Sequence, residues 1–197
     1  APARRDEKLS AHVRNWFFGS YLPHVYRRRA KRPVDETAVF LQYRGASERE
    51  DFAPLRQAFS NVLPGVSCKT VLLSRNISGG LRYLRRCRDA IREVSCARIL
   101  VTAEDMPAVS ALVLRRETVH LRLPARVYPL REFGRATLSY TGGYKLPFDH
   151  APYENVTLGP APATCFVPLF SIAYGKEAPP LGSPLFDLLR SESYGKH

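Results

Sequence analysis

Long uninterrupted apolar runs are missing from this 197-residue chain. No stretch reaches the roughly 18 consecutive apolar residues that mark a membrane-spanning helix, so we expect no segment to cross a bilayer. The first residues, which include Arg4, Arg5, Asp6 and Glu7, carry too much charge for a secretory signal peptide. These two absences predict a cytoplasmic protein.

The four cysteines lack the spacing of a structural metal site. No two of them form a CxxC pair, and no histidine lies at the usual zinc-ligand spacing from Cys68, Cys87, Cys96 or Cys165. Reduced and mostly buried thiols are therefore expected, as is usual in the cytoplasm. We predict neither a bound metal nor a cofactor.

Short motifs that bind nucleotides or nucleic acids are also missing. Ser78, Gly79 and Gly80 open a helical pattern but lack the GxGxxG or GxxxxGK[ST] context of a phosphate loop, so we interpret them as a plain helix start. No RRM, KH, helix-turn-helix or zinc motif is found. Any partner must therefore be inferred from charge and from longer patterns.

Positive charge is abundant and unevenly distributed, with a formal net charge of +12 at pH 7. Residues 1–32 hold nine Lys or Arg against Asp6 and Glu7, a balance of +7, whereas the rest of the chain carries 21 against 16. This asymmetry predicts a polyanionic partner, which could be nucleic acid, an anionic membrane surface or a phosphate-rich substrate.

The basic N-terminal segment has the periodicity of an amphipathic helix over residues 5–29, with an interruption expected near Pro23. Its apolar stripe and basic end comprise Leu9, Val13, Trp16, Phe17, Tyr21, Arg27, Arg28 and Arg29. Two interpretations remain open. The stripe packs on the following domain, or Trp16 and Phe17 insert among lipid headgroups while the arginines meet anionic lipid. Both hold if the helix packs at the domain edge.

Residues 33–197 alternate between β-branched runs and helical stretches. Strands are predicted at 37–43, 68–74, 97–102, 117–123 and 153–159. Helices are predicted at 47–59, where Ser47 and Glu50 form a capping box, and at 78–97, 106–116, 163–175 with a break at Pro168, and 183–191. This order predicts a Rossmann-like parallel sheet with helices on both faces, in one α/β domain that follows the 1–32 segment.

The C-terminal third carries a series of motifs in a characteristic order. His150, Tyr153, Val156, Tyr174, Gly175, Gly182, Pro184 and Asp187 match a His-x-x-Tyr-x-x-Val strand, a helix ending in an aromatic-Gly turn, and a Gly-x-Pro-x-x-Asp motif. Upstream, "PLREFG" at Pro129–Gly134 is similar to a Pro-Leu-Lys-x-x-Gly loop. Over roughly residues 97–189 the chain resembles the CDP-glycerol glycerophosphotransferases of teichoic acid assembly.

This resemblance implies the N-terminal, acceptor-side half of a GT-B fold, on the cytoplasmic face of the cell membrane. The acceptor, a lipid-linked polyanion, would attack the β-phosphate of CDP-glycerol and release CMP. Since the nucleotide donor is bound mainly by the second half in that family, we expect that half to be missing here and the chain alone to be inactive. CDP-glycerol or a similar donor would be the only small molecule required.

The arginine-rich stretch after the fourth predicted strand is the candidate site. We expect Arg126, Arg131, Arg135 and Lys145 to hold acceptor phosphate, because a guanidinium binds phosphate oxygens in a fork. His150 is the candidate catalytic or positioning histidine. The family's Trp-His pair is absent, and we interpret His120, out of register with it, as a packed or hydrogen-bonded histidine.

Three functional hypotheses therefore remain open. The first is the acceptor-side half of a glycerophosphotransferase. The second is a non-catalytic descendant of that fold that binds a polyanionic polymer or membrane, favoured by the missing Trp-His pair. The third is a basic, ribosome-associated nucleic-acid-binding protein, for which Arg82, Arg85, Arg86 and Arg88 would line one helix.

Overall fold

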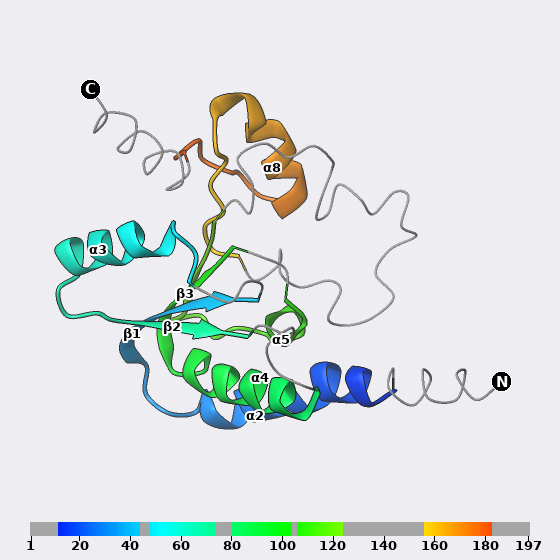
Figure 1. The fold of residues 1–197 in the computed structure, drawn as a ribbon. Helices are drawn as coiled ribbons and strands as arrows, with labels where there is room; N and C mark the ends of the chain where they lie inside the picture. The colour runs from blue at the N-terminus through cyan, green and yellow to red at the C-terminus, as the bar shows by residue number, and fades with distance from the viewer. Residues whose placement is uncertain (1–11, 44–47, 74–79, 104–105, 124–155, 183–197) are drawn as a thin grey trace.

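The computed structural model describes residues 12–43, 48–73, 80–103, 106–123 and 156–182, and all structural statements refer to these ranges (Figure 1). Four parallel strands form one sheet in the order β2-β1-β3-β4. The strands are β1 (Asp35–Gln42), β2 (Ser67–Leu72), β3 (Ala97–Thr102) and β4 (Val119–Arg122). This arrangement confirms the predicted Rossmann-like parallel sheet and four of its predicted strands.

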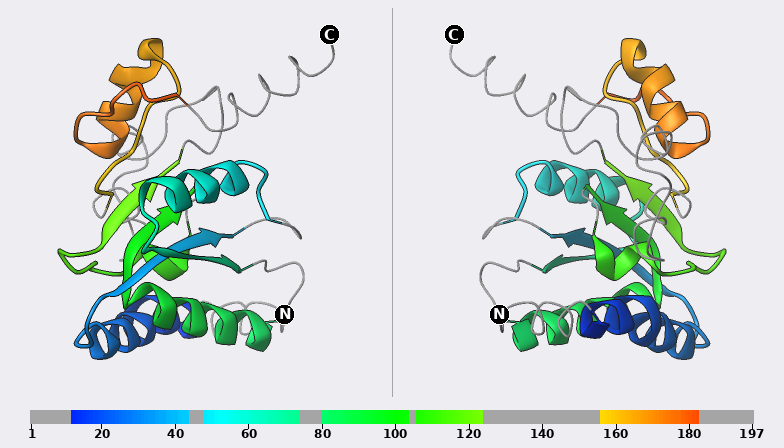
Figure 2. Two further views of the ribbon diagram at one scale, coloured as in Figure 1. Left: turned by 90° about the vertical axis from the view of Figure 1, so that its left-hand side faces the viewer. Right: turned by 90° about the vertical axis from the view of Figure 1, so that its right-hand side faces the viewer.

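Helices cover both faces of the sheet, as predicted (Figure 2). Helix α3 (Phe52–Val62) lies on one face, and α4 (Gly80–Val94) lies on the other beside the N-terminal helix. A short helix, α5 (Pro107–Ser110), connects β3 to β4. Helices cover the central strand β1 on both faces of the sheet. Its side chains are therefore apolar on both sides, and Ala38 to Leu41 are all fully buried.

The N-terminal segment is one helix that does not stop at Pro23. Residues 12–16 are helical and lead into a π-helical turn, η1 (Phe17–Tyr21), and then into α2 (Leu22–Arg29). The Leu22 N–H bonds to the Phe17 carbonyl, five residues back. Pro23 lies in the first turn of α2, where its missing N–H is tolerated beside the widened turn. The interruption that we expected at Pro23 is therefore wrong.

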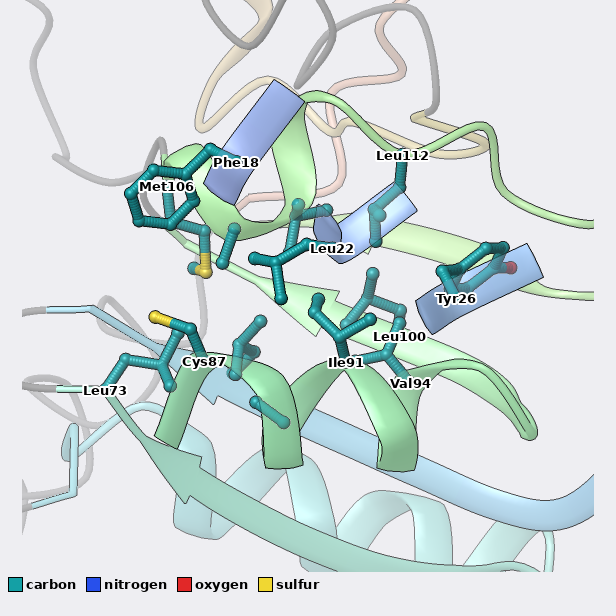
Figure 3. Packing of buried hydrophobic residues seen from close by; sticks show 14 of the residues in the cluster. Phe18, Leu22, Tyr26, Leu73, Cys87, Ile91, Val94, Leu100, Met106 and Leu112 are labelled. Carbon is teal, nitrogen blue, oxygen red and sulfur yellow. The ribbon is translucent and has the colours of Figure 1, made fainter. Parts of the chain in front are cut away.

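The core between this helix and α4 is the larger of the two cores of the sheet (Figure 3). Leu22 and Tyr26 are 0% and 2% exposed, and they face Ile91 and Val94 of α4. The Tyr26 hydroxyl also accepts a hydrogen bond from the Arg115 N–H at 3.0 Å. The interpretation that the helix packs on the domain is thus confirmed, and the segment shares the domain's core.

Helix α3 begins later than the capping box predicted. Asp51 is its N-cap residue, and its side chain makes no cap hydrogen bond. Glu50 lies in a turn before the helix, and Ser47 falls outside the described residues. The prediction of a box there is wrong, because Asp51 is engaged by Arg49, as described below. The helix predicted at 106–116 is likewise shorter and ends at Ser110.

The strand predicted at 153–159 is absent over its described part, residues 156–159. Only one bridge forms, between Leu158 and Leu121 of β4. A 3-10 turn, η3 (Thr164–Phe166), then leads into α8 (Val167–Tyr174). Pro168 sits in the first turn of α8 and does not break it, and Gly175 ends the helix with φ 65°. The helix predicted at 183–191 lies outside the described residues.

Candidate functional site at the carboxyl ends of the strands

Both ends of the candidate site segment lie beside β4. The chain passes Leu123 at the carboxyl end of β4, and it is next described at Val156. Residues 157 and 158 run parallel to β4: the Thr157 N–H donates to the His120 carbonyl at 2.9 Å, and the Arg122 N–H donates to the Leu158 carbonyl at 2.9 Å. Residues 124–155 therefore leave β4 at its carboxyl end, where parallel-sheet sites form, and the chain returns beside the amino end of β4, because residues 157 and 158 run parallel to it.

The residues predicted to hold phosphate or to catalyse belong to this segment. They are Arg126, Arg131, Arg135, Lys145 and His150, and all five lie outside the described residues. The described part of the chain places the residues on either side of them, at the end of β4 and at residues 156–158.

His120 is a buried structural histidine, as expected from the sequence. Its side chain is 1% exposed, and its Nε2 lies 2.8 Å from the Thr102 hydroxyl of the neighbouring strand β3. Its backbone N–H also donates to the Thr157 hydroxyl at 3.0 Å. The backbone of His120 thus holds the returning chain against β4, while its buried imidazole bonds to Thr102 and cannot reach an acceptor hydroxyl in solvent.

Arg122, which was not among the predicted phosphate ligands, is buried at the end of β4. It ends β4 directly opposite Thr102 of β3 and is only 5% exposed. As alternate strand residues share a face, Arg122 lies on the same side of the sheet as His120. A guanidinium keeps its charge at cellular pH, so β4 brings a positive charge to the carboxyl edge of the sheet. The sequence signal was an arginine within an apolar strand.

A second polar cluster fixes the chain where it returns from the end of β1. The Arg49 N–H donates to the Gln42 side-chain carbonyl at 2.9 Å, and its guanidinium binds both Asp51 oxygens at 2.8 and 2.7 Å. Asp51 and Gln42 are 3% and 4% exposed. This bidentate pair lies over the Phe52 ring. It joins β1 to α3 at the same edge of the sheet, and periodicity alone did not predict it.

A neighbouring cluster joins α3 to β2. Thr70 of β2 donates its hydroxyl to Glu48 at 2.7 Å, and Arg56 of α3 forms an ion pair with Glu48 at 3.1 Å. Both charged side chains are about one-third exposed. Their charges therefore neutralise each other, and the cluster holds α3 against the edge strand without creating an unpaired charge for a ligand.

The cysteines are free thiols, and their placement argues against nucleophilic chemistry in the described core. Burial raises the pKa of the Cys87 thiol to about 12, and burial also raises the pKa of the adjacent Tyr83 hydroxyl. Cys96 is buried as well, whereas Cys165 is exposed. Since the thiolate is the nucleophilic form, Cys87 is inert near neutral pH.

No group of three or more His, Cys, Asp or Glu side chains in the described ranges is arranged to hold a metal ion. No helix there combines the length and the apolar character needed to cross a bilayer.

The residues predicted to bind a membrane are divided by the fold. Phe17 is buried at 7% exposure and stacks on Tyr21, so it is not available to lipid in this conformation. Trp16 is 58% exposed. Arg27 and Arg28 are exposed at the end of α2, and Arg29 is partly buried. Periodicity identified the apolar stripe, but only packing on α4 separates its buried members from its exposed ones.

Comparison of the chain with models of known protein families and with curated protein sequences finds no match.

Proposed function

We propose that this chain is the acceptor-binding half of a CDP-glycerol-type glycerophosphotransferase of cell-envelope polymer synthesis, working at the cytoplasmic face of a membrane. One observation carries the proposal. The arginine-rich segment with the "PLREFG" frame follows directly on β4, and so starts at the carboxyl edge of a Rossmann-like sheet. Such edges hold the sites of parallel α/β sheets.

The chemistry of phosphate binding supports this choice of segment. A glycerol phosphate polymer carries one negative charge per unit, and forked guanidinium groups pair with phosphate oxygens by charge-assisted hydrogen bonds. Arg126, Arg131, Arg135 and Lys145 supply four positive charges within the segment. In the proposed reaction these groups hold the acceptor while its terminal hydroxyl attacks the donor β-phosphate.

No described histidine is free to act as the general base of such a reaction at this edge. His120 is buried and bonded to Thr102, and the other described histidines, His12 and His24, belong to the N-terminal helix. His150 therefore remains the proposed positioning or catalytic histidine. The same observation favours the second candidate function, a non-catalytic descendant that binds the polymer only.

A binding measurement tests the acceptor site. We would titrate the protein against a fluorescent glycerol phosphate oligomer of about ten units and against single-stranded RNA with as many phosphates, at about 150 mM salt. We expect the protein to bind the oligomer more tightly than the RNA. The double variant Arg126→Ala with Arg131→Ala should weaken the affinity for the oligomer about tenfold or more, since each substitution removes hydrogen bonds to a charged group.

The matched control removes two positive charges at the amino ends of the strands, away from the start of the segment. Lys31→Gln follows α2 and Arg98→Gln lies near the start of β3, both are exposed, and this pair should leave oligomer binding within about twofold. Equal affinity for RNA and oligomer, or equal losses in the two double variants, would show that only bulk charge is recognised. Release of CMP from CDP-glycerol that His150→Asn abolishes would favour the enzyme over its non-catalytic descendant.

A further inference from the structure

The N-terminal helix and α4 lie side by side and both have basic exposed sides, although 50 residues separate them in the sequence (Figure 1). We call these two exposed sides together the two-helix face. Its exposed members are Val13, Arg14, Trp16, His24, Arg27 and Arg28 on the first helix and Leu81, Arg82, Arg85, Arg86 and Arg92 on α4. The opposite sides of both helices are buried in the core described above (Figure 3).

The two helices run side by side in the same direction. Phe18 packs against Tyr83, with ring centroids 6.3 Å apart, and Figure 3 shows Leu22 and Tyr26 following the same order as Ile91 and Val94. Trp16 and Leu81 therefore fall at one end of the two-helix face. That end is also the carboxyl edge of the sheet, because α4 begins after β2 ends and runs back along it.

Charge on this layer is strongly positive. Residues 12–32 and 80–94 together hold eleven Arg or Lys against Asp89 and Glu93. Both acids are already paired: Asp89 with Arg88 at 3.0 Å and Arg92 at 3.4 Å, and Glu93 with Lys69 at 2.9 Å. Within the described ranges no ion pair involves Arg28, Arg82, Arg85 or Arg86.

Exposed apolar side chains accompany this charge at one end. Trp16, Leu81 and Val13 are 58%, 76% and 49% exposed. A polynucleotide gains little from an exposed leucine or valine, whereas a lipid interface accepts Trp and Leu among the headgroups while arginines meet the lipid phosphates. The combination favours a bilayer over a nucleic acid.

We propose that the two-helix face docks on an anionic lipid bilayer, with α4 contributing as much to the contact as the N-terminal helix. Trp16 and Leu81 enter the headgroup region, and Arg82, Arg85 and Arg28 contact lipid phosphates. Docking at this end would hold the carboxyl edge of the sheet near the bilayer. The docking itself does not depend on the proposed function. Only its consequence does, which is that a lipid-linked acceptor comes within reach of the site.

Flotation with vesicles tests the contribution of α4. The intact protein is mixed with phosphatidylcholine vesicles containing about 30 mol% phosphatidylglycerol, or with phosphatidylcholine alone, at about 150 mM salt. We expect flotation only with the anionic vesicles. Each basic residue near the membrane surface raises the partition coefficient about fivefold, so the double variant Arg82→Gln with Arg85→Gln should lower it about 25-fold.

Two comparisons make the result specific. The charge-matched pair Arg56→Gln with Lys176→Gln should change partition by no more than about twofold. Trp16→Ser with Leu81→Ser should reduce flotation while leaving RNA binding unchanged, since a membrane contact uses the apolar groups and a nucleic-acid contact does not. All six positions are at least partly exposed, and circular dichroism verifies that each variant is folded.

Several outcomes would overturn the inference. The α4 variant could float like the unmodified protein, the control pair could weaken flotation equally, or RNA could be bound while no vesicle is. Each result excludes α4 as half of a membrane surface. None of them affects the oligomer-binding test, which depends on Arg126 and Arg131, so failures of the two proposals are distinguishable.

Discussion

At the scale of single residues, the polar contacts at the sheet edge matter more for the architecture than any predicted motif. The Arg49–Asp51 pair is the clearest case, because its carboxylate is 3% exposed and receives two hydrogen bonds from one guanidinium. A buried charge is tolerated only when it is paired. This pair therefore maintains the turn that connects β1 to α3 at the candidate site.

Asp51→Asn should lower the free energy of unfolding by about 2–3 kcal/mol, because Arg49 keeps its charge and loses its charged partner. Urea denaturation followed by circular dichroism measures the difference. The control is Glu36→Gln, which removes a carboxylate from the exposed ion pair with Arg98 and should cost less than about 1 kcal/mol. Similar losses in the two variants would contradict the assigned role of the buried pair.

Sequence patterns at this scale had a limited reach. His120 was correctly expected to be packed, because a one-residue shift on a strand turns a side chain to the other face. The capping box at Ser47 and Glu50 was wrong, because the pattern cannot reveal that Arg49 folds back on Asp51 and that the helix starts only at Phe52. Long-range partners such as Thr102 for His120 are likewise absent from local sequence.

At the scale of elements, α8 is held against the residues that return to β4. Tyr174 of α8 is 2% exposed, and its ring lies so close to Gly159 that a Cβ built there would come within 2.5 Å of it. Gly159 thus permits the close approach of α8 to the segment that follows the bridge at Leu158. The aromatic-Gly turn and the candidate site segment are thereby connected through packing.

Gly159→Ala should destabilise the protein by about 1–3 kcal/mol, because the buried ring cannot move aside without disturbing its neighbours. Thermal unfolding monitored by calorimetry would measure this cost. Gly65→Ala is the matched control, since a Cβ there meets nothing within 4 Å, and it should be neutral within about 0.5 kcal/mol. A Gly159→Ala variant as stable as the control would show that Tyr174 is not tightly packed.

Helices and strands were predicted correctly where the hydrophobic pattern extends over many residues. The prediction was wrong where a single proline was taken as the end of a helix. β3 was predicted with its observed bounds, and α4 was found within a few residues at each end. Pro23 and Pro168 were both interpreted as breaks, yet each occupies the first turn of a helix. Proline is compatible with that position because the first N–H groups have no intrahelical acceptor.

At the scale of the whole molecule, the N-terminal helix behaves as part of the domain. Phe17, Phe18, Leu22 and Tyr26 belong to the same buried cluster as Leu100 of the central sheet. The helix thus covers sheet residues with one side and presents the two-helix face with the other. Residues 1–32 and 33–197 therefore differ in their charge, as composition suggests. We predict that they nevertheless unfold together as one cooperative unit.

A chain that starts at Pro33 should fail to fold cooperatively. Four large buried side chains would be lost, each worth about 1.5–3 kcal/mol, and their sum is comparable to the whole stability of a typical domain. Near-ultraviolet circular dichroism and limited proteolysis would report the loss of tertiary packing. If the shortened chain instead unfolds in one sharp transition at a similar temperature, the helix is a separable appendage.

The sequence by itself determined the parallel α/β architecture, the amphipathic N-terminal helix and the concentration of positive charge, because each depends on local periodicity or composition. Only the tertiary structure decided which side of that helix is buried, that α4 lies beside it with a second set of exposed arginines, and that the chain on both sides of the arginine-rich segment lies against β4. These features depend on contacts between residues far apart in the chain, and no local pattern encodes such contacts.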